Sequence, residues 1–226
     1  HGSSAASDVY KRQDIDEDIQ INTLLPVVDF INDNHKIPIS IDTRSSKVAM
    51  AFENYNIQFI NDVSSGFHDS NMLEAVSRLG CRFIMTHMPR EHKEGKIKVF
   101  DNIVNEISEY FIERIESCNK AGIKTEKLII DPGIGFGKSG EDNIKLLNNI
   151  HSLKKVHNHI CIGSSNKKYS SRLFENIQTK EDLKIANLAT FATSTLSDAT
   201  YLRVHDVELT KDTVQAVSYT HLTLPT

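Results

Sequence analysis

Residues 127–140, KLIIDPGIGFGKSG, decide the fold of this chain. The segment begins with Leu128, Ile129 and Ile130, a short apolar run typical of a buried parallel strand. This run ends on Asp131, and a glycine-rich turn follows before helical spacing resumes at residue 141. A strand, an acid, a glycine turn and a helix in this order place a carboxylate at the carboxyl end of a strand, where α/β proteins bind ligands.

Two nucleotide-binding motifs overlap this segment, and neither fits. Residues 135–140 satisfy the G-x-G-x-x-G dinucleotide pattern, but that pattern also needs an acidic residue about 20 positions later, and the region near Ile160 has none. Residues 137–139 read GKS, like the end of a P-loop, but the first glycine of a P-loop would fall on Pro132. The glycine turn therefore calls for another explanation.

The composition describes a soluble globular chain that is long enough for one large domain, with 226 residues, 39% hydrophobic and 25% charged. A net charge of −4 indicates no nucleic-acid partner, and no apolar run has the length of a membrane span. The spacing of Cys81, Cys118 and Cys161 fits neither a disulfide framework nor a zinc site. With no signal peptide, the sequence predicts buried thiols and a cytoplasmic location.

Both ends of the chain lack the periodicity of the rest. Residues 1–13 show neither a helical nor a strand period, and residues 218–226 interrupt a helical pattern that is still running. We expect both segments to be non-native sequence and residues 14–217 to form the folded domain.

Six apolar runs alternate with helical patterns through that domain. We expect strands at 36–41, 57–60, 81–86, 128–130, 160–162 and 201–204, with helices at 19–31, 44–54, 70–79, 100–121, 141–152, 181–196 and from residue 210 on. Strict alternation predicts a parallel sheet, and six units fill most of the length of a (β/α)₈ barrel. Because the first element is a helix without a strand before it, we predict an incomplete TIM (β/α)₈-type barrel with strands three to eight present.

Every predicted strand is followed by a polar or ionisable side chain. These residues are Asp42, Asn61, His87, Asp131, Ser165, Lys167, Arg203 and His205. The carboxyl ends of barrel strands meet at one face, which carries the active site in enzymes of this architecture. We therefore expect one shared site at this face.

Three of these residues suit a nitrogen-rich heterocycle, although each also has a structural explanation. The carboxylate of Asp131 can accept two parallel N–H bonds from such a ring, or it can cap the following turn. Asn61 offers both a donor and an acceptor, or it simply begins a loop. Asp42 can face the ligand, or it can cap the helix at 44–54.

The remaining candidates are cationic. Arg203 lies inside the expected strand YLRV, where an unpaired charge is costly, so it should stack on a flat ring or pair with an anion. His205 is two residues later and should point to the same side, which makes a clamp for a phosphate or diphosphate. Lys167 lies in a polar loop at 164–180, where solvent exposure explains it equally well, and His87 is expected to be structural.

With these residues in place, the chain resembles dihydropteroate synthases, a pterin-binding TIM-barrel family. The matching blocks are SIDT at 40–43, INDV at 60–63, MTHM at 85–88, DPGIGFGK at 131–138, GSSNK at 163–167 and RVHDV at 203–207. They follow the family's order across about residues 17–217, and the DPGIGFGK and RVHDV blocks are the most specific.

The resemblance implies an enzyme of folate biosynthesis that joins 6-hydroxymethyl-7,8-dihydropterin pyrophosphate to para-aminobenzoate, giving 7,8-dihydropteroate and pyrophosphate. It implies that Asp42, Lys167 and Arg203 are catalytic. The residues implied to bind the substrates are Asp42, Asn61, Asp131, Gly135, Phe136, Ser165, Lys167, Arg203 and His205. Arg203 would lie against the pterin and, with His205, hold the pyrophosphate, while Ser165 and Phe136 would border the aminobenzoate and sulfonamide site. The resemblance also implies Mg²⁺ and a homodimer of the intact parent protein.

The chain departs from the family pattern at several places. Asn166 stands where the family usually has arginine, and Thr86 stands where a methionine usually floors the pterin pocket. The first strand, which carries the asparagine that helps bind magnesium pyrophosphate, has no counterpart here. We therefore expect this chain to be inactive alone. The alternatives are a pterin-dependent methyltransferase domain, which needs no diphosphate clamp, and a non-catalytic pterin-binding remnant.

Overall fold

The computed structural model describes residues 15–163 and 179–223. Within them the chain forms six strands, and helices flank them in sequence. The strands are β1 (Ile39–Asp42), β2 (Ile57–Asp62), β3 (Arg82–Thr86), β4 (Leu128–Asp131), β5 (Cys161–Ile162) and β6 (Tyr201–Leu202). The helices are α1 (Glu17–Asn34), α2 (Ser46–Met50), α3 (Met72–Leu79), α4 (Arg90–Lys93), α5 (Ile103–Lys120), the 3₁₀ turn η1 (Thr125–Lys127), α6 (Gly140–Asn148), α7 (Ile150–Leu153), α9 (Lys180–Leu196) and α10 (Val207–Thr223).

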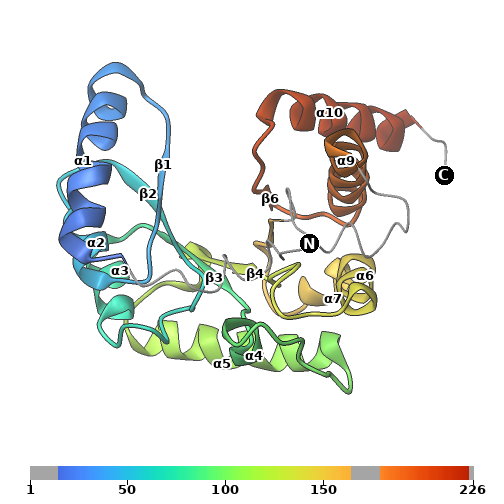
Figure 1. The fold of residues 1–226 in the computed structure, drawn as a ribbon, viewed down its shortest axis with the longest axis horizontal. Helices are drawn as coiled ribbons and strands as arrows, with labels where there is room; N and C mark the ends of the chain where they lie inside the picture. Colours follow the sequence, from blue (N-terminus) through green and yellow to red (C-terminus); the bar gives the residue numbers. More distant parts are fainter. Residues whose placement is uncertain (1–14, 164–178, 224–226) are drawn as a thin grey trace, which may run out of the picture.

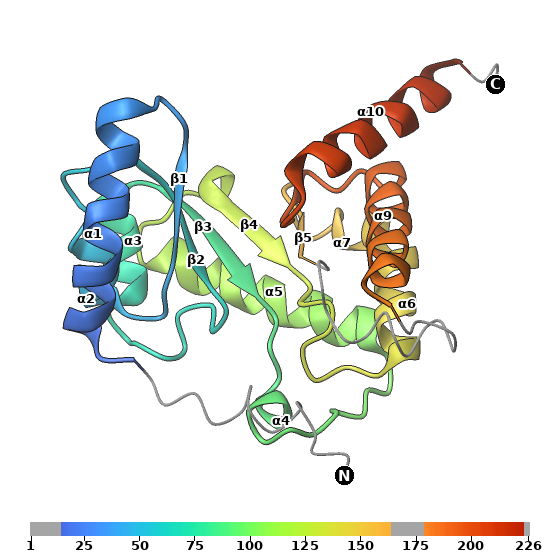
Figure 2. The same cartoon turned by 45° about the horizontal axis from the view of Figure 1, so that its top comes forward.

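All of these strands pair in parallel and in the order of the chain. Strands β1 to β4 form one sheet, and β5 pairs with β6. A single parallel bridge between Ile130 and Ile160 joins β4 to the start of β5. The helices lie around the outside of this curved wall (Figure 1), and the turned view in Figure 2 shows the same arrangement. The parallel α/β architecture predicted for a partial barrel is therefore confirmed.

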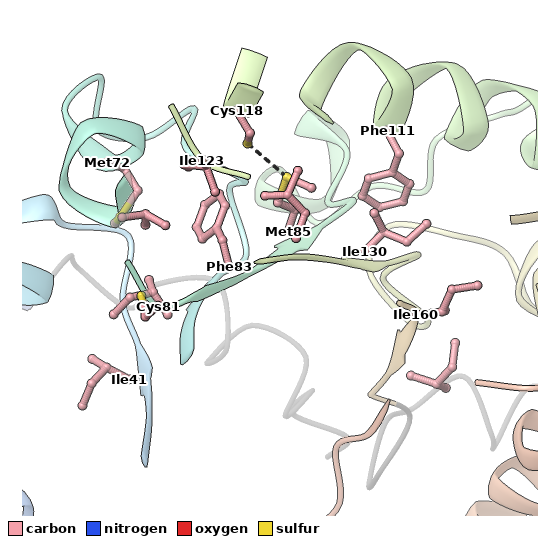
Figure 3. Packing of buried hydrophobic residues seen from close by; sticks show 14 of the residues in the cluster. Ile41, Met72, Cys81, Phe83, Met85, Phe111, Cys118, Ile123, Ile130 and Ile160 are labelled. Carbon is pink, nitrogen blue, oxygen red and sulfur yellow. Dashed lines mark hydrogen bonds between the residues drawn. The ribbon is translucent and has the colours of Figure 1, made fainter. Parts of the chain in front are cut away.

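The apolar side chains of the strands form two clusters because successive residues point to opposite faces. The larger cluster packs the outer face against the helices, as Figure 3 shows for Phe83, Met85 and Phe111. The smaller cluster fills the inner face with Ile84, Ile129 and Cys161, against which Phe59 of β2 and Tyr201 of β6 pack.

The rings of Phe59 and Tyr201 meet edge-on with their centroids 5.9 Å apart, so β2 and β6 are joined across the interior. Filled interior layers of this kind are typical of TIM barrels, in which the space between the strands is a core rather than a pore.

Several predicted boundaries were wrong, each for a local reason. Helix α2 is capped by the hydroxyl of Ser45, which accepts from the backbone N–H of Val48 at 3.2 Å, so Asp42 is not its cap. The helix predicted at 141–152 breaks at Asn149 into α6 and α7, and the short helix α4 was not predicted.

The last strand and helix differ most from the prediction. Strand β6 ends at Leu202, so Arg203 does not lie inside a strand. The carboxylate of Asp206 accepts from the backbone N–H of Leu209 at 3.1 Å, which caps α10 and starts it before residue 210. This helix then continues to Thr223, so it is not interrupted at residue 218.

Among residues 15–163 and 179–223, no helix has the length and apolarity needed to cross a bilayer. The three cysteines are buried, as predicted, and no disulfide joins any two of them.

Candidate functional site

A cleft of about 620 Å³ opens at the carboxyl ends of β1 and β2. Its lining includes Asp42 and Asn61, the polar residues at the ends of these two strands, together with Val63 and His68 from the loop after β2. Asp42 and Asn61 are direct partners in the β1–β2 register, so the parallel pairing itself sets them side by side. Two of the predicted site residues therefore share one concave surface.

Arg203, which directly follows the last strand β6, contacts Asp42 of this pair. The side-chain amide of Asn61 donates to Oδ1 of Asp42 at 2.5 Å, and the guanidinium of Arg203 forms an ion pair with Oδ2 of the same carboxylate. Asn61 is buried, whereas the side chains of Asp42 and Arg203 are about half exposed, at 52% and 53%. One carboxylate therefore connects the ends of β1, β2 and β6 while it remains accessible to a ligand.

Asp131 lies beside Arg203 at the same mouth. One of its oxygens, Oδ1, accepts from the backbone N–H of Gly133 at 2.8 Å, so the turn-capping explanation holds for that oxygen. The other, Oδ2, is directed toward Gly163, where an added β-carbon would lie 3.6 Å from Oδ2 and 3.7 Å from Cβ of Arg203. Gly163 thus sits between the two charged residues, whereas the cleft at β1 and β2 is lined by Asp42 and Asn61 but not by Asp131 or Arg203.

The glycine turn after Asp131 is fixed by a buried lysine that sequence reasoning missed. The ammonium of Lys138 donates to the backbone oxygens of His87 at 3.0 Å, Gly133 at 2.9 Å and Phe136 at 3.2 Å. Only 3% of the surface of Lys138 is exposed. Lysine is almost never buried without such compensation, so Lys138 ties the turn to the end of β3.

The backbone of this turn also requires glycine at one position. Gly133 has a φ of +70°, and a β-carbon there would lie 2.1 Å from the backbone oxygen of His87. No other residue fits this approach without moving the end of β3. The close backbone contact expected of this turn is therefore present at Gly133, but the contact is with the protein's own strand.

Gly135 and Phe136 lie at the tip of this turn. The backbone N–H of Gly135 donates to the side-chain oxygen of Asn143 at 2.8 Å, which anchors the tip to α6. The ring of Phe136 is partly exposed and meets the ring of His92 edge-on at 5.0 Å. The ring of Phe136 is therefore held against α4, and its expected place beside the aminobenzoate stays a prediction.

The end of β3 forms the floor between these groups. Thr86 is buried and pairs with Asp131 in the β3–β4 register. His87 follows it, and burial, with the nearby charges of Lys138 and Lys98, holds the pKa of its imidazole well below 6.5. His87 is therefore neutral at pH 7. Its backbone oxygen accepts a hydrogen bond from the ammonium of Lys138, which connects it to the glycine turn.

A second buried residue shapes the loop after Asn61 and was also missed. Asp62 is fully buried and accepts from the backbone N–H of Ser64, the hydroxyl of Ser64 and the backbone N–H of Gly66, at 2.7, 2.6 and 2.7 Å. Burial raises the pKa of this carboxyl despite these bonds. The sequence did offer a signal, because Asp62 is the acidic residue directly after Asn61 in the segment INDV at 60–63.

The other predicted residues stand as follows. Ser165 and Lys167 lie outside the described residues. His205 is exposed and follows the end of β6, so strand alternation does not place it on the side of Arg203.

Within residues 15–163 and 179–223 there is no group of three metal-binding side chains, and Asp42 is already paired with Arg203. The described donors do not fit a magnesium ion held by protein side chains alone.

Comparisons with known proteins agree on one family. The family model described as "Pterin binding enzyme" matches residues 5–205. The chain is 32% identical over 213 residues to dihydropteroate synthase of Escherichia coli K12, covering 93% of this chain and 72% of that protein. It is 31% identical over 194 residues to the Clostridium beijerinckii enzyme, covering 85% and 69%.

Solved structures give the same result. A dihydropteroate synthase of Xanthomonas albilineans with 4-aminobenzoic acid matches with a TM-score of 0.86 at 28% identity, covering 94% of this chain and 78% of that chain. The same enzyme in complex with 7,8-dihydropteroate matches with a TM-score of 0.84 at 28% identity, covering 94% and 80%.

Proposed function

Because the chain belongs to the family of pterin-binding enzymes, we propose that it is a dihydropteroate synthase polypeptide that acts in folate synthesis. The reaction joins 6-hydroxymethyl-7,8-dihydropterin pyrophosphate to para-aminobenzoate and releases pyrophosphate. The observation that carries the proposal is the convergence of Asp42, Asn61, Asp131 and Arg203 on one mouth of the partial barrel.

The buried side of the mouth is suited to the pterin ring. Oδ2 of Asp131 lies on the side of Gly163 and Arg203, and we assign the amidine-like N–H edge of the pterin to this carboxylate, since a carboxylate is the natural partner for such an edge. Asn61 is fixed by its bond to Asp42 and retains a side-chain oxygen that can accept from a second edge of the ring. The guanidinium plane of Arg203 can stack on a flat ring and pair with an anion.

The chemistry requires one bond to form and one to break. The aminobenzoate nitrogen bonds to the methylene carbon of the pterin, the carbon–oxygen bond to the diphosphate breaks, and the diphosphate leaves with that electron pair. The nitrogen then loses a proton. As the bond to the diphosphate breaks, positive charge develops on the methylene carbon, and the carboxylate of Asp42 is placed to stabilise it. Arg203 and His205 would hold the negative charge of the departing diphosphate.

The same proposal covers the aminobenzoate site, magnesium, the cellular location and the oligomeric state. Phe136 and Ser165 would border the aminobenzoate, and Lys167 would contribute to the pterin pocket. Magnesium would come with the diphosphate, and we assign no step to it. A cytoplasmic location and a homodimer of the parent protein belong to the same proposal.

Calorimetry separates the synthase from its alternatives, and it does not require turnover. The chain is titrated with a non-reactive pterin pyrophosphate analogue and with the same pterin lacking the diphosphate. The synthase predicts that the diphosphate strengthens binding and that Arg203→Ala removes this gain. The matched control is Arg78→Ala, which removes an exposed arginine on α3 that is paired with Glu53 at 2.8 Å.

Equal affinity for the two pterins would contradict the synthase and favour a methyltransferase domain or a binding remnant. Loss of the gain in both arginine variants would show that net charge, rather than the position of Arg203, attracts the diphosphate.

A further inference from the structure

A second cleft, of about 520 Å³, lies between the loop after β2, the loop after β3 and helix α5. Its walls include Phe67, His87 and Tyr110, and Arg90 and Lys93 lie at its rim. The four residues that carry the proposed function do not line it. The cleft therefore needs an explanation of its own.

The rim of this cleft is cationic. Arg90 and Lys93 are exposed and form no ion pair with any residue in the part of the chain that the structure describes. Lys98 also lines the cleft but is paired with Glu106 at 2.9 Å. Glu91 contributes one negative charge to the lining. Two cations are thus available to an anionic ligand.

One wall of the cleft is aromatic. Phe67 is 61% exposed although it is a large apolar side chain. The guanidinium of Arg114 lies 4.1 Å from the centre of its ring, and the ring of Tyr110 lies 6.2 Å away. These contacts fix Phe67 as a flat platform, and covering its exposed apolar surface would be favourable.

One buried histidine lines the cleft. His87 is 6% exposed, and its ring packs edge-on against Tyr110 of α5 at 4.8 Å and lies 6.1 Å from the ring of Phe100. Its Nδ1 has no hydrogen-bond partner among the described residues and almost no exposed surface, so a ligand in the cleft can contact His87 but cannot reach that atom. The imidazole therefore serves as a nearby reporter of binding.

We propose that this cleft is an auxiliary binding site for a small aromatic carboxylate. The ring of the ligand would lie on Phe67 and Tyr110, and the carboxylate would pair with Arg90 and Lys93. An aromatic carboxylate matches both the platform and the charge, whereas an inorganic anion matches only the charge.

The auxiliary cleft shares a wall with the cleft at β1 and β2. His68 lines both, and the loop between them is held by the three hydrogen bonds to Asp62. The auxiliary cleft is therefore adjacent to, but distinct from, the cleft at β1 and β2.

The test uses the 226-residue chain with benzoate as the probe. Calorimetry gives the affinity, and NMR of ¹³C-labelled histidine reports whether His87 is perturbed. The double variant Arg90→Ala/Lys93→Ala is expected to weaken benzoate binding by at least about tenfold. The matched control is Lys96→Ala, which removes a neighbouring lysine that does not line the cleft and is paired with Glu94 at 2.8 Å.

Benzoate resembles para-aminobenzoate, so binding at the proposed substrate site must be separated from binding in this cleft. Phe136→Ala makes that separation, because Phe136 is expected to border the aminobenzoate and does not line the auxiliary cleft. Phe67→Ala, at an exposed position, should also weaken binding of benzoate more than binding of cyclohexanecarboxylate. The proposal is overturned if benzoate does not bind, if the double variant binds it normally, if Phe136→Ala abolishes binding, or if inorganic phosphate binds equally well.

Discussion

The mouth of the partial barrel has two sides that are built differently. The acid side, with Asn61, Asp131 and the glycine turn, is buried and held by hydrogen bonds from several elements. The arginine side, which carries Arg203, is exposed, and Arg203 meets the acid side through its ion pair with Asp42. Strands β2 to β4 have four to six residues each, whereas β5 and β6 have two.

The difference indicates a division of labour. A rigid pocket suits a flat ring that must be read by its hydrogen-bonding edge, because preorganised groups lose little entropy on binding. An exposed arginine can exchange Asp42 for an incoming diphosphate at little cost, because exposed ion pairs contribute little to stability. We therefore expect changes on the acid side to alter folding, and changes on the arginine side to alter binding alone.

Gly133→Ala breaks the acid side most severely. The new β-carbon would lie 2.1 Å from the backbone oxygen of His87, so β3 or the turn must move. We expect a loss of more than about 3 kcal/mol in the free energy of unfolding, measured by urea denaturation. The control is Gly80→Ala, which has a similar φ of +62° but no atom within 4 Å, and should cost only about 1–2 kcal/mol. Equal losses would mean that the close approach at Gly133 is unimportant.

Lys138→Met tests the hydrogen bonds of the buried ammonium group with a side chain of similar length. It leaves the carbonyls of His87, Gly133 and Phe136 without their shared donor, so we expect a loss of about 2–4 kcal/mol in the free energy of unfolding. Lys145→Met, which removes an exposed lysine from α6, should leave the urea midpoint unchanged. An unchanged urea midpoint for Lys138→Met would show that the turn does not depend on the hydrogen bonds from Lys138.

The pH dependence of stability reports on His87. Its folded pKa is lowered, so the folded state binds fewer protons than the unfolded state, and stability is full above pH 6.5 and lost as pH falls below it. The slope for one such group is up to about 1.4 kcal/mol per pH unit. His87→Gln should reduce the fall between about pH 6.5 and 5 and change nothing between about pH 7 and 8. His159, whose pKa is also lowered, remains in both proteins.

Arg203→Ala should have the smallest effect on folding. Because both members of its ion pair with Asp42 are half exposed, we expect the free energy of unfolding to change by less than about 0.5 kcal/mol. The same variant loses the diphosphate-dependent part of pterin binding. A large loss of stability would contradict the division between the two sides.

The sequence predicted the elements well where periodicity was long and strong. The six strands and the helices at residues 17–34 and 103–120 follow from apolar spacing alone. Asp42, Asn61 and Asp131 were found because polar residues that end parallel strands must share one face. Those predictions needed no knowledge of tertiary contacts.

The errors came from interactions that depend on distant or backbone atoms. Lys138 was considered on its own only as part of a P-loop, because its partners are carbonyl oxygens that no pattern of side chains reveals. Arg203 was expected inside a strand since TYLRV reads as β structure, but the cap at Asp206 ends that segment early. Asp62 was overlooked because its partners lie within four residues and form a loop rather than a periodic element.

We propose above all that the ends of the strands form one site that recognises a pterin through hydrogen bonds to the edge of its ring. The most direct test is calorimetry of a pterin without diphosphate on the chain and on Asp131→Asn, which keeps the shape and an oxygen for the N–H of Gly133. Replacing this charged acceptor with a neutral amide predicts at least about 100-fold weaker binding, measured under conditions in which circular dichroism shows both proteins to be folded. Equal affinity of the two proteins for the pterin would contradict the claim.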